Sequence, residues 1–191
     1  MKRDVLGAVL TGGRSTRMGR DKADVLVGGV SMLDRVAEAL ASLVDRVVVL
    51  GADREGWESW PDSVHSQGPL AGVATALSRT TARHVLVVAV DHAFVRSVTL
   101  SMILEQGDGL PVVPVDDSGV RQVTCALYPA SIAAEAAEEA AVGGTIQTLL
   151  DRVSFLPVTP AEWRSWGEDG RSWFSVDDED ALASGLRLFA G

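Results

Sequence analysis

Two kinds of segment alternate along the chain. Short runs rich in Val and Leu are followed by longer Ala- and Leu-rich segments, in which apolar residues recur with the spacing of one helix face. This order is typical of α/β proteins. We therefore predict a Rossmann-like three-layer α/β/α sandwich with a mostly parallel sheet. The length of 191 residues favours a single domain over residues 1–191.

The pattern also predicts where the elements lie. Strands are expected over residues 5–10, 47–50, 84–90, 111–115, 122–128, 154–158 and 173–176. Helices are expected over residues 31–44, 69–78, 97–106, 131–141, 145–153 and 178–189. Ser31 suits an N-cap, and Pro69 suits the first position of a helix.

Composition narrows the class of protein. Hydrophobic residues make up 47% of the chain, which is enough for a sizeable core, and the single Cys forms no internal disulfide or zinc cluster. A single Cys is typical of a protein in a reducing compartment, so we expect a cytoplasmic location. No run of 18 apolar residues is present, so we expect no membrane-spanning segment. The net charge of −9 disfavours binding to nucleic acid.

Positive charge is nevertheless concentrated in one short segment. Arg14, Arg17, Arg20 and Lys22 lie within eleven residues and are opposed there by Asp21 alone. Lys22 is also one of only two lysines, the other being Lys2. A lysine ammonium binds terminal phosphates as a compact point charge. The segment is therefore a candidate anion site.

Two glycines begin this segment directly after the first predicted strand. Gly12 and Gly13 allow backbone amides to approach phosphate oxygens closely. The segment lacks the lysine and hydroxyl that follow the second glycine of a P-loop, and it lacks the G-x-G-x-x-G pattern of dinucleotide-binding folds. Residues 11–22, 91–94 and 177–178 all follow predicted strands. In open α/β sheets, ligands bind at the carboxyl ends of the strands.

Three motifs resemble one known family. The run LTGGRSTRMGRDKA, residues 10–23, resembles the signature of the molybdenum cofactor nucleotidyltransferases, which include the MobA-like guanylyltransferases and their cytidylyltransferase relatives. The G-P-L-A-G run at 68–72 and the T-C-A-L-Y run at 124–128 are similar to later motifs of that family. The resemblance implies a fold of the nucleotide-diphospho-sugar transferase type. It also implies transfer of GMP from Mg-GTP to the phosphate of molybdopterin, with release of pyrophosphate, in molybdenum cofactor biosynthesis.

The resemblance assigns roles to particular residues. Arg17, Lys22 and Asp91 are expected to be catalytic, and Asp91 and Asp177 to bind Mg²⁺. The nucleotide-binding residues are expected to be Leu10, Thr11, Gly12, Gly13, Arg14, Gly19, Lys22, His65, Gly68 and Asp91. Transient contacts with molybdenum cofactor insertion and maturation proteins also follow from the family.

The chain departs from the family pattern at three places. The V-D-H-A-F run at 90–94 keeps the Asp and Phe of the family's C-D-M-P-F motif but loses its Cys, Met and Pro. Asp177 is retained near the C-terminus, whereas Ser175 replaces an Asn or Asp. His65 stands where the family has a carboxylate that reads guanine, and a neutral His accepts only one hydrogen bond.

These departures leave two alternatives to the guanylyltransferase hypothesis. One is a related transferase that uses CTP for molybdopterin or that acts on a sugar phosphate. The other is a non-catalytic nucleotide-binding partner protein, because the motifs around Asp91 and Asp177 are altered.

Overall fold

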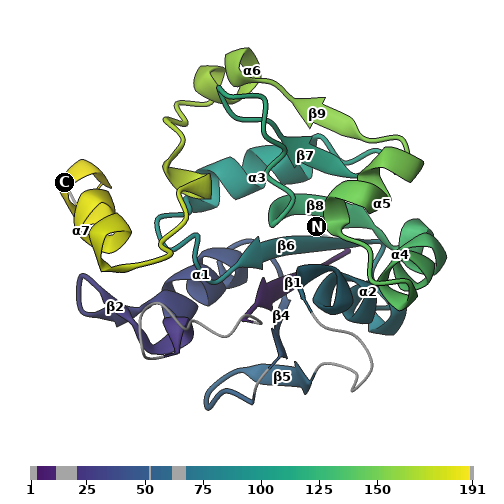
Figure 1. Cartoon of the computed structure of the whole chain (residues 1–191), viewed down its shortest axis with the longest axis horizontal. Coiled ribbons are helices and arrows are strands. Elements are labelled where there is room, and N and C mark those ends of the chain that lie inside the picture. Colours follow the sequence, from purple (N-terminus) through teal and green to yellow (C-terminus); the bar gives the residue numbers. More distant parts are fainter. Residues whose placement is uncertain (1–3, 12–20, 52, 62–67, 190–191) are drawn as a thin grey trace.

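The computed structural model describes residues 4–11, 21–51, 53–61 and 68–189. Within these ranges, seven strands form one sheet in the order β5-β4-β1-β6-β8-β7-β9 (Figure 1). The strands are β1 (Val5–Leu10), β4 (Arg46–Gly51), β5 (Glu58–Pro61), β6 (His84–Ala89), β7 (Val112–Pro114), β8 (Cys125–Pro129) and β9 (Leu156–Val158). Only β8 of this sheet runs antiparallel to its neighbours, so the sheet is mostly parallel.

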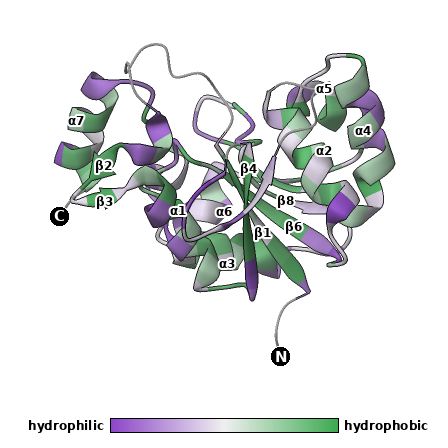
Figure 2. Cartoon of the chain, turned by 90° about the horizontal axis from the view of Figure 1, so that it is seen from below, coloured by the Kyte–Doolittle hydropathy of each residue, from purple (hydrophilic) through white to green (hydrophobic). Residues whose placement is uncertain are grey.

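Helices cover both faces of the sheet. One face packs against α1 (Met32–Ala41), α3 (Ser97–Glu105), α6 (Pro160–Ser165) and α7 (Glu179–Phe189). The other packs against α2 (Pro69–Arg79), α4 (Ala133–Ala141) and α5 (Ile146–Arg152), which Figure 2 shows grouped together. Side chains alternate along β1, so that Ala8 joins the core beneath α2 and Val9 the core beneath α1. The predicted three-layer α/β/α sandwich is confirmed.

Most predicted elements are present because their signals are local. The strand over residues 5–10 has the predicted bounds. Ser31 caps α1 by accepting a hydrogen bond from the amide of Asp34, and Pro69 is the first residue of α2. The helix predicted from residue 131 begins as a short 3-10 turn, η2 (Ala130–Ile132).

The strand predicted over residues 173–176 is wrong. Trp173 ends a 3-10 turn, η3 (Arg171–Trp173), and the next residues form no strand. The amide of Val176 instead donates to the carbonyl of Asp91 at 2.9 Å. The sequence pattern also missed several short elements: η1 (Lys22–Asp24), the hairpin of β2 (Leu26–Val27) and β3 (Val30–Ser31), β5 and α6.

The order of the strands places the carboxyl ends of β1 and β6 side by side. The chain leaves β1 to form β4 on one side and then returns to form β6 on the other, so β1 and β6 are parallel neighbours with Leu10 opposite Ala89. Helix α2 lies close over this region because Gly72 has no side chain: a Cβ there would lie 2.8 Å from Cδ2 of Leu10. The residues after β1 and β6 therefore share one edge of the sheet.

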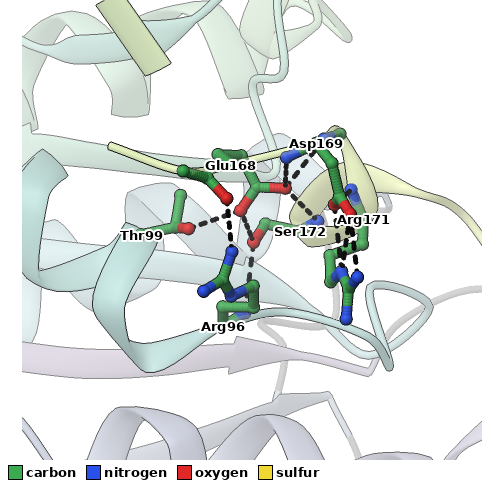
Figure 3. Close-up of polar contacts among 8 residues, drawn as sticks. Arg96, Thr99, Glu168, Asp169, Arg171 and Ser172 are labelled. Carbon is green, nitrogen blue, oxygen red and sulfur yellow. Dashed lines mark hydrogen bonds and ion pairs between the residues drawn. The ribbon is translucent and has the colours of Figure 1, made fainter. Parts of the chain in front are cut away.

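A buried carboxylate anchors the C-terminal segment to α3 (Figure 3). Glu168 is only 3% exposed, and its two oxygens accept bonds from the hydroxyls of Thr99 and Ser172 and from the amides of Asp169, Gly170 and Ser172. Arg96 adds a bond of 2.6 Å to the carbonyl of Gly167. These contacts fix the path of the chain toward residue 177.

None of the helices in the described ranges combines the length and apolar character needed to cross a membrane.

Candidate active site

A lysine and two carboxylates meet at the carboxyl edge of the sheet. Nζ of Lys22 donates to Oδ1 of Asp177 at 2.6 Å and lies 3.9 Å from Oδ2 of Asp91. Asp91 follows β6, and Asp177 lies between η3 and α7. These three predicted residues, which span 155 positions of the chain, are thus brought together.

Ser175 joins the two carboxylates. Its hydroxyl lies 3.1 Å from Oδ2 of Asp91 and 3.0 Å from Oδ2 of Asp177. A hydroxyl donates only one proton at a time, so it serves one of these oxygens at any moment. The sequence flags Ser175 only as a departure from the family motif, whereas the structure places it at the centre of the pair.

The two carboxylates fit a magnesium ion. Oδ1 of Asp91 is buried and has no hydrogen-bond partner among the described residues. The side chain of Asp177 is 53% exposed. In the described part of the chain, no cluster of three or more His, Cys, Asp or Glu side chains is placed to hold a metal. A site with two carboxylates suits Mg²⁺, which usually completes its shell with phosphate oxygens and water.

A buried histidine lies behind Asp91. Nε2 of His92 shares a hydrogen bond of 2.9 Å with the hydroxyl of Thr124 and lies 3.9 Å from Oδ1 of Asp91. Burial lowers the pKa of His92, although the charges of Asp91 and Asp177 act to raise it. The imidazole is therefore neutral at neutral pH, and Lys22 supplies the positive charge between the carboxylates.

The short turn η1 fixes the base of Lys22. The carboxylate of Asp21 accepts a bond from the amide of Ala23 and so caps the turn. Ala23 and Val25 are fully buried, and the carbonyl of Val25 accepts from the amide of Met32 at the start of α1. The backbone on both sides of Lys22 is thereby held by the core, and only its long side chain reaches the site.

A cavity of about 360 Å³ lies next to the N-terminus of α2. Gly68 precedes this helix with φ +94°, a conformation that favours glycine, and it leaves the first turn without a side-chain cap. The cavity is lined by Gly68, Pro69, Leu70, Val123, Thr124 and residues 143–147. Because Thr124 also bonds His92, the wall of the cavity connects to the turn that carries Asp91. Gly68 is one of the predicted nucleotide-binding residues, and both motifs at 68–72 and 124–128 contribute to the lining, whereas residues 143–147 carried no signal of a site in the sequence.

The remaining predicted site residues divide into two groups. Leu10 and Thr11 lie at the end of β1: the Leu10 side chain is buried, its carbonyl accepts from the amide of Val90, and the Thr11 hydroxyl donates to the carbonyl of Leu50. The other predicted residues lie outside the described ranges: Gly12, Gly13, Arg14, Arg17, Gly19 and His65.

The sheet order and this charged edge define an α/β protein with a candidate ligand site at the carboxyl ends of its strands. Residues 7–154 match the model of the MobA-like NTP transferase domain. The chain belongs to the MobA-like NTP transferase family.

Comparisons with individual proteins agree with this family. The chain is 36% identical over 111 residues to the probable molybdenum cofactor guanylyltransferase of Pelotomaculum thermopropionicum, covering 56% of this chain and 54% of that protein. It is 36% identical over 138 residues to the molybdenum cofactor guanylyltransferase of Rhizobium meliloti, covering 65% of this chain and 63% of that protein. The chain thus spans about half to two thirds of the length of these relatives.

A solved structure has the same fold over nearly the whole chain. It is the molybdopterin-guanine dinucleotide biosynthesis protein A from Archaeoglobus fulgidus. The TM-score is 0.83 at 23% identity, and the match covers 97% of this chain and 98% of that one.

Proposed function

We propose that this protein transfers GMP from Mg-GTP to the phosphate of molybdopterin, with release of pyrophosphate, in molybdenum cofactor biosynthesis. The observation that carries the proposal is the contact of Lys22 with the paired carboxylates Asp91 and Asp177, in a chain that belongs to the MobA-like family. The guanylyltransferase names of the relatives favour GTP and molybdopterin as substrates.

The chemistry needs charge neutralisation more than proton transfer. A phosphate monoester has a second pKa of about 6, so the attacking oxygen already carries negative charge at neutral pH. This oxygen forms a bond to the α-phosphorus of GTP while the bond between the α- and β-phosphates breaks, and pyrophosphate leaves. The residues therefore have to bind several anionic groups in line and stabilise their charge.

The described residues suit these tasks. Lys22 would bind the β- or γ-phosphate as the leaving group gains charge, and Asp91 and Asp177 would hold Mg²⁺. When bound, Mg²⁺ would neutralise phosphate oxygens and favour attack on the α-phosphorus. The ammonium of Lys22 lies against both carboxylates, 2.6 Å from Asp177 and 3.9 Å from Asp91. A phosphate that draws Lys22 away would leave both carboxylates to the ion.

Several further expectations belong to this proposal. We expect Arg17 to act with Lys22 on the phosphates, Gly12, Gly13, Arg14 and Gly19 to line the nucleotide site, and His65 to lie near the base. A single domain, a cytoplasmic location and transient contacts with cofactor insertion and maturation proteins also remain predictions.

Pyrophosphate release tests the proposal directly. Purified protein is incubated with molybdopterin, Mg²⁺ and either GTP, CTP, ATP or UTP, and each nucleotide is also tested without acceptor. Acceptor-dependent release with GTP supports the proposal. Release with CTP instead contradicts it and favours the cytidylyltransferase alternative. Turnover with a sugar phosphate in place of molybdopterin contradicts the proposal that molybdopterin is the acceptor. Nucleotide binding without release of pyrophosphate favours a non-catalytic partner protein.

A further inference from the structure

Arg54 contacts the two carboxylates that flank Lys22 in the sequence. It lies in the loop between β4 and β5, and one of its terminal nitrogens donates to Asp21 while the other donates to Asp24 at 3.3 Å. The Arg54 side chain is 14% exposed, whereas the side chains of Asp21 and Asp24 are 46% and 69% exposed. The guanidinium is thus the inner partner of both ion pairs.

The backbone of Arg54 is itself held in place. Its amide donates to the hydroxyl of Ser59 at 3.0 Å, and its carbonyl accepts from the amide of Trp57 at 3.3 Å. Ser59 lies in β5, so the edge of the sheet determines where the guanidinium is placed. A planar guanidinium on a fixed base is well suited to bridge two separate carboxylates.

The sequence D-K-A-D at 21–24 creates a competition for the ammonium of Lys22. A lysine side chain is long and flexible, and carboxylates one and two positions away are potential partners. In the structure, Lys22 extends instead to Asp177, and Asp21 and Asp24 are paired with Arg54. Exposed ion pairs of this kind contribute little to stability. Their effect here is on which partner Lys22 meets.

We infer that Arg54 is a positioning residue for Lys22: it neutralises Asp21 and Asp24 and thereby directs the ammonium toward Asp91, Asp177 and the phosphates of a bound nucleotide. Arg54 acts through Lys22 and is assigned no contact with the reacting atoms. The inference deepens the proposed function, on which it rests for the identity of the ligand.

The first test needs no ligand and uses the scarcity of lysine in this chain. Lys2 and Lys22 are the only lysines, so reductive methylation with ¹³C-formaldehyde labels two lysines and the N-terminal amine, and Lys22→Ala identifies the Lys22 signal by NMR. Arg54→Ala is expected to shift the Lys22 signal and leave the Lys2 signal unchanged. Arg46→Ala, which removes an arginine pair with Glu58 on the neighbouring strands, is the matched control and should shift neither. An unchanged Lys22 signal in Arg54→Ala would overturn the inference.

The second test measures binding of Mg-GTP by calorimetry. We expect Arg54→Ala to weaken binding about tenfold, as for coupled residues of one ion-pair network. In a background of Lys22→Ala, the same substitution should have almost no further effect. If the fold-losses of affinity for Mg-GTP from the two single substitutions multiply in the double variant, Arg54 acts independently of Lys22 and the inference is refuted.

A rescue distinguishes positioning from a general structural role. Combining Arg54→Ala with Asp21→Asn and Asp24→Asn removes the competing charges, and Asn retains the capacity to cap η1. This triple variant should restore the Lys22 signal and most of the affinity for Mg-GTP. Failure of the rescue while the variant remains folded would contradict the inference.

Arg54→Gln keeps the inference testable if Arg54→Ala does not fold, because it retains hydrogen-bond donors without the charge and adds no third lysine to the labelled groups. A shifted Lys22 signal and about threefold weaker binding are expected; a Lys22 signal identical to that of the unsubstituted protein would count against the inference. Failure of the proposed function has a different signature. The unsubstituted protein would then release no pyrophosphate, whereas the response of Lys22 to Arg54→Ala would persist.

Discussion

Glu168 and Asp91 are two carboxylates that differ in how many hydrogen-bond donors surround them. Glu168 is almost completely buried, and five hydrogen-bond donors serve its two oxygens (Figure 3). Asp91 has one oxygen near Ser175 and Lys22, and its buried second oxygen has no hydrogen-bond partner in the described part of the chain. A carboxylate saturated by the protein stabilises the fold, whereas an unsaturated one retains capacity for a ligand. We therefore call Glu168 the structural acid and Asp91, which is proposed to bind Mg²⁺, the functional acid.

The largest effect is expected at the functional site. Lys22→Ala should lower the rate of pyrophosphate release by about a thousandfold, because the leaving phosphates lose their fixed positive charge. The melting temperature should change little, since the pair with the half-exposed Asp177 is open to solvent and such pairs contribute about 0–1 kcal/mol. Steady-state kinetics and thermal unfolding of the same preparation measure both. Near-normal turnover would remove Lys22 from the mechanism.

The structural acid should show the reverse behaviour. Glu168→Gln places an amide group where only acceptors fit, and we expect the free energy of unfolding to fall by about 3 kcal/mol. Chemical denaturation measures this change. Asp169→Asn is the matched control, because Asp169 pairs with Arg171 at the surface and should contribute much less. Equal losses for both variants would contradict the distinction between the two sites.

Asp91→Asn tests the functional acid itself. We expect about a hundredfold loss of turnover and a magnesium titration displaced to higher concentration, because a metal ligand and a negative charge are lost. The fold should survive, as judged by circular dichroism. A magnesium titration identical to that of the unsubstituted protein would place the metal elsewhere.

The smallest effect is expected from Ser175→Ala. This change removes the hydroxyl between the two carboxylates but no charge. A single hydrogen bond contributes about 0.5–1.5 kcal/mol, so the magnesium concentration for half-maximal activity should change by about two- to tenfold. An effect as large as that of Asp91→Asn would show that Ser175 has a further role.

Sequence reasoning succeeded where structure is decided locally. The buried strand over residues 5–10, the cap at Ser31 and the helix start at Pro69 each follow from a few neighbouring residues. The predicted strand over residues 173–176 failed because Trp173 ends a 3-10 turn and packs against Trp163, and the amide of Val176 donates to the carbonyl of Asp91 instead of pairing with a strand. That outcome depends on tertiary packing, which composition does not reveal.

The site shows the same division. Lys22 and Asp91 follow strands whose carboxyl ends meet, so their proximity follows from the topology. Asp177 was expected there from the family resemblance and from a predicted strand over residues 173–176 that does not form. Arg54 had no sequence signal, because it meets Asp21 across 33 positions through two loops. The roles of Gly12, Gly13, Arg14, Arg17, Gly19 and His65 stay predictions.

Asp177 lies near the C-terminal end of the chain, after residue 154 where the family match ends, so the ribosome adds it after most of the sheet. The sheet strands up to β9, and then Glu168 with its hydrogen-bond partners, are all translated before the second carboxylate. A chain interrupted before residue 177 would keep Lys22 and Asp91 but lack their shared partner. Premature termination or proteolytic loss of this short segment would therefore remove the second proposed magnesium ligand together with α7, whose Leu182, Leu186 and Phe189 pack against the core.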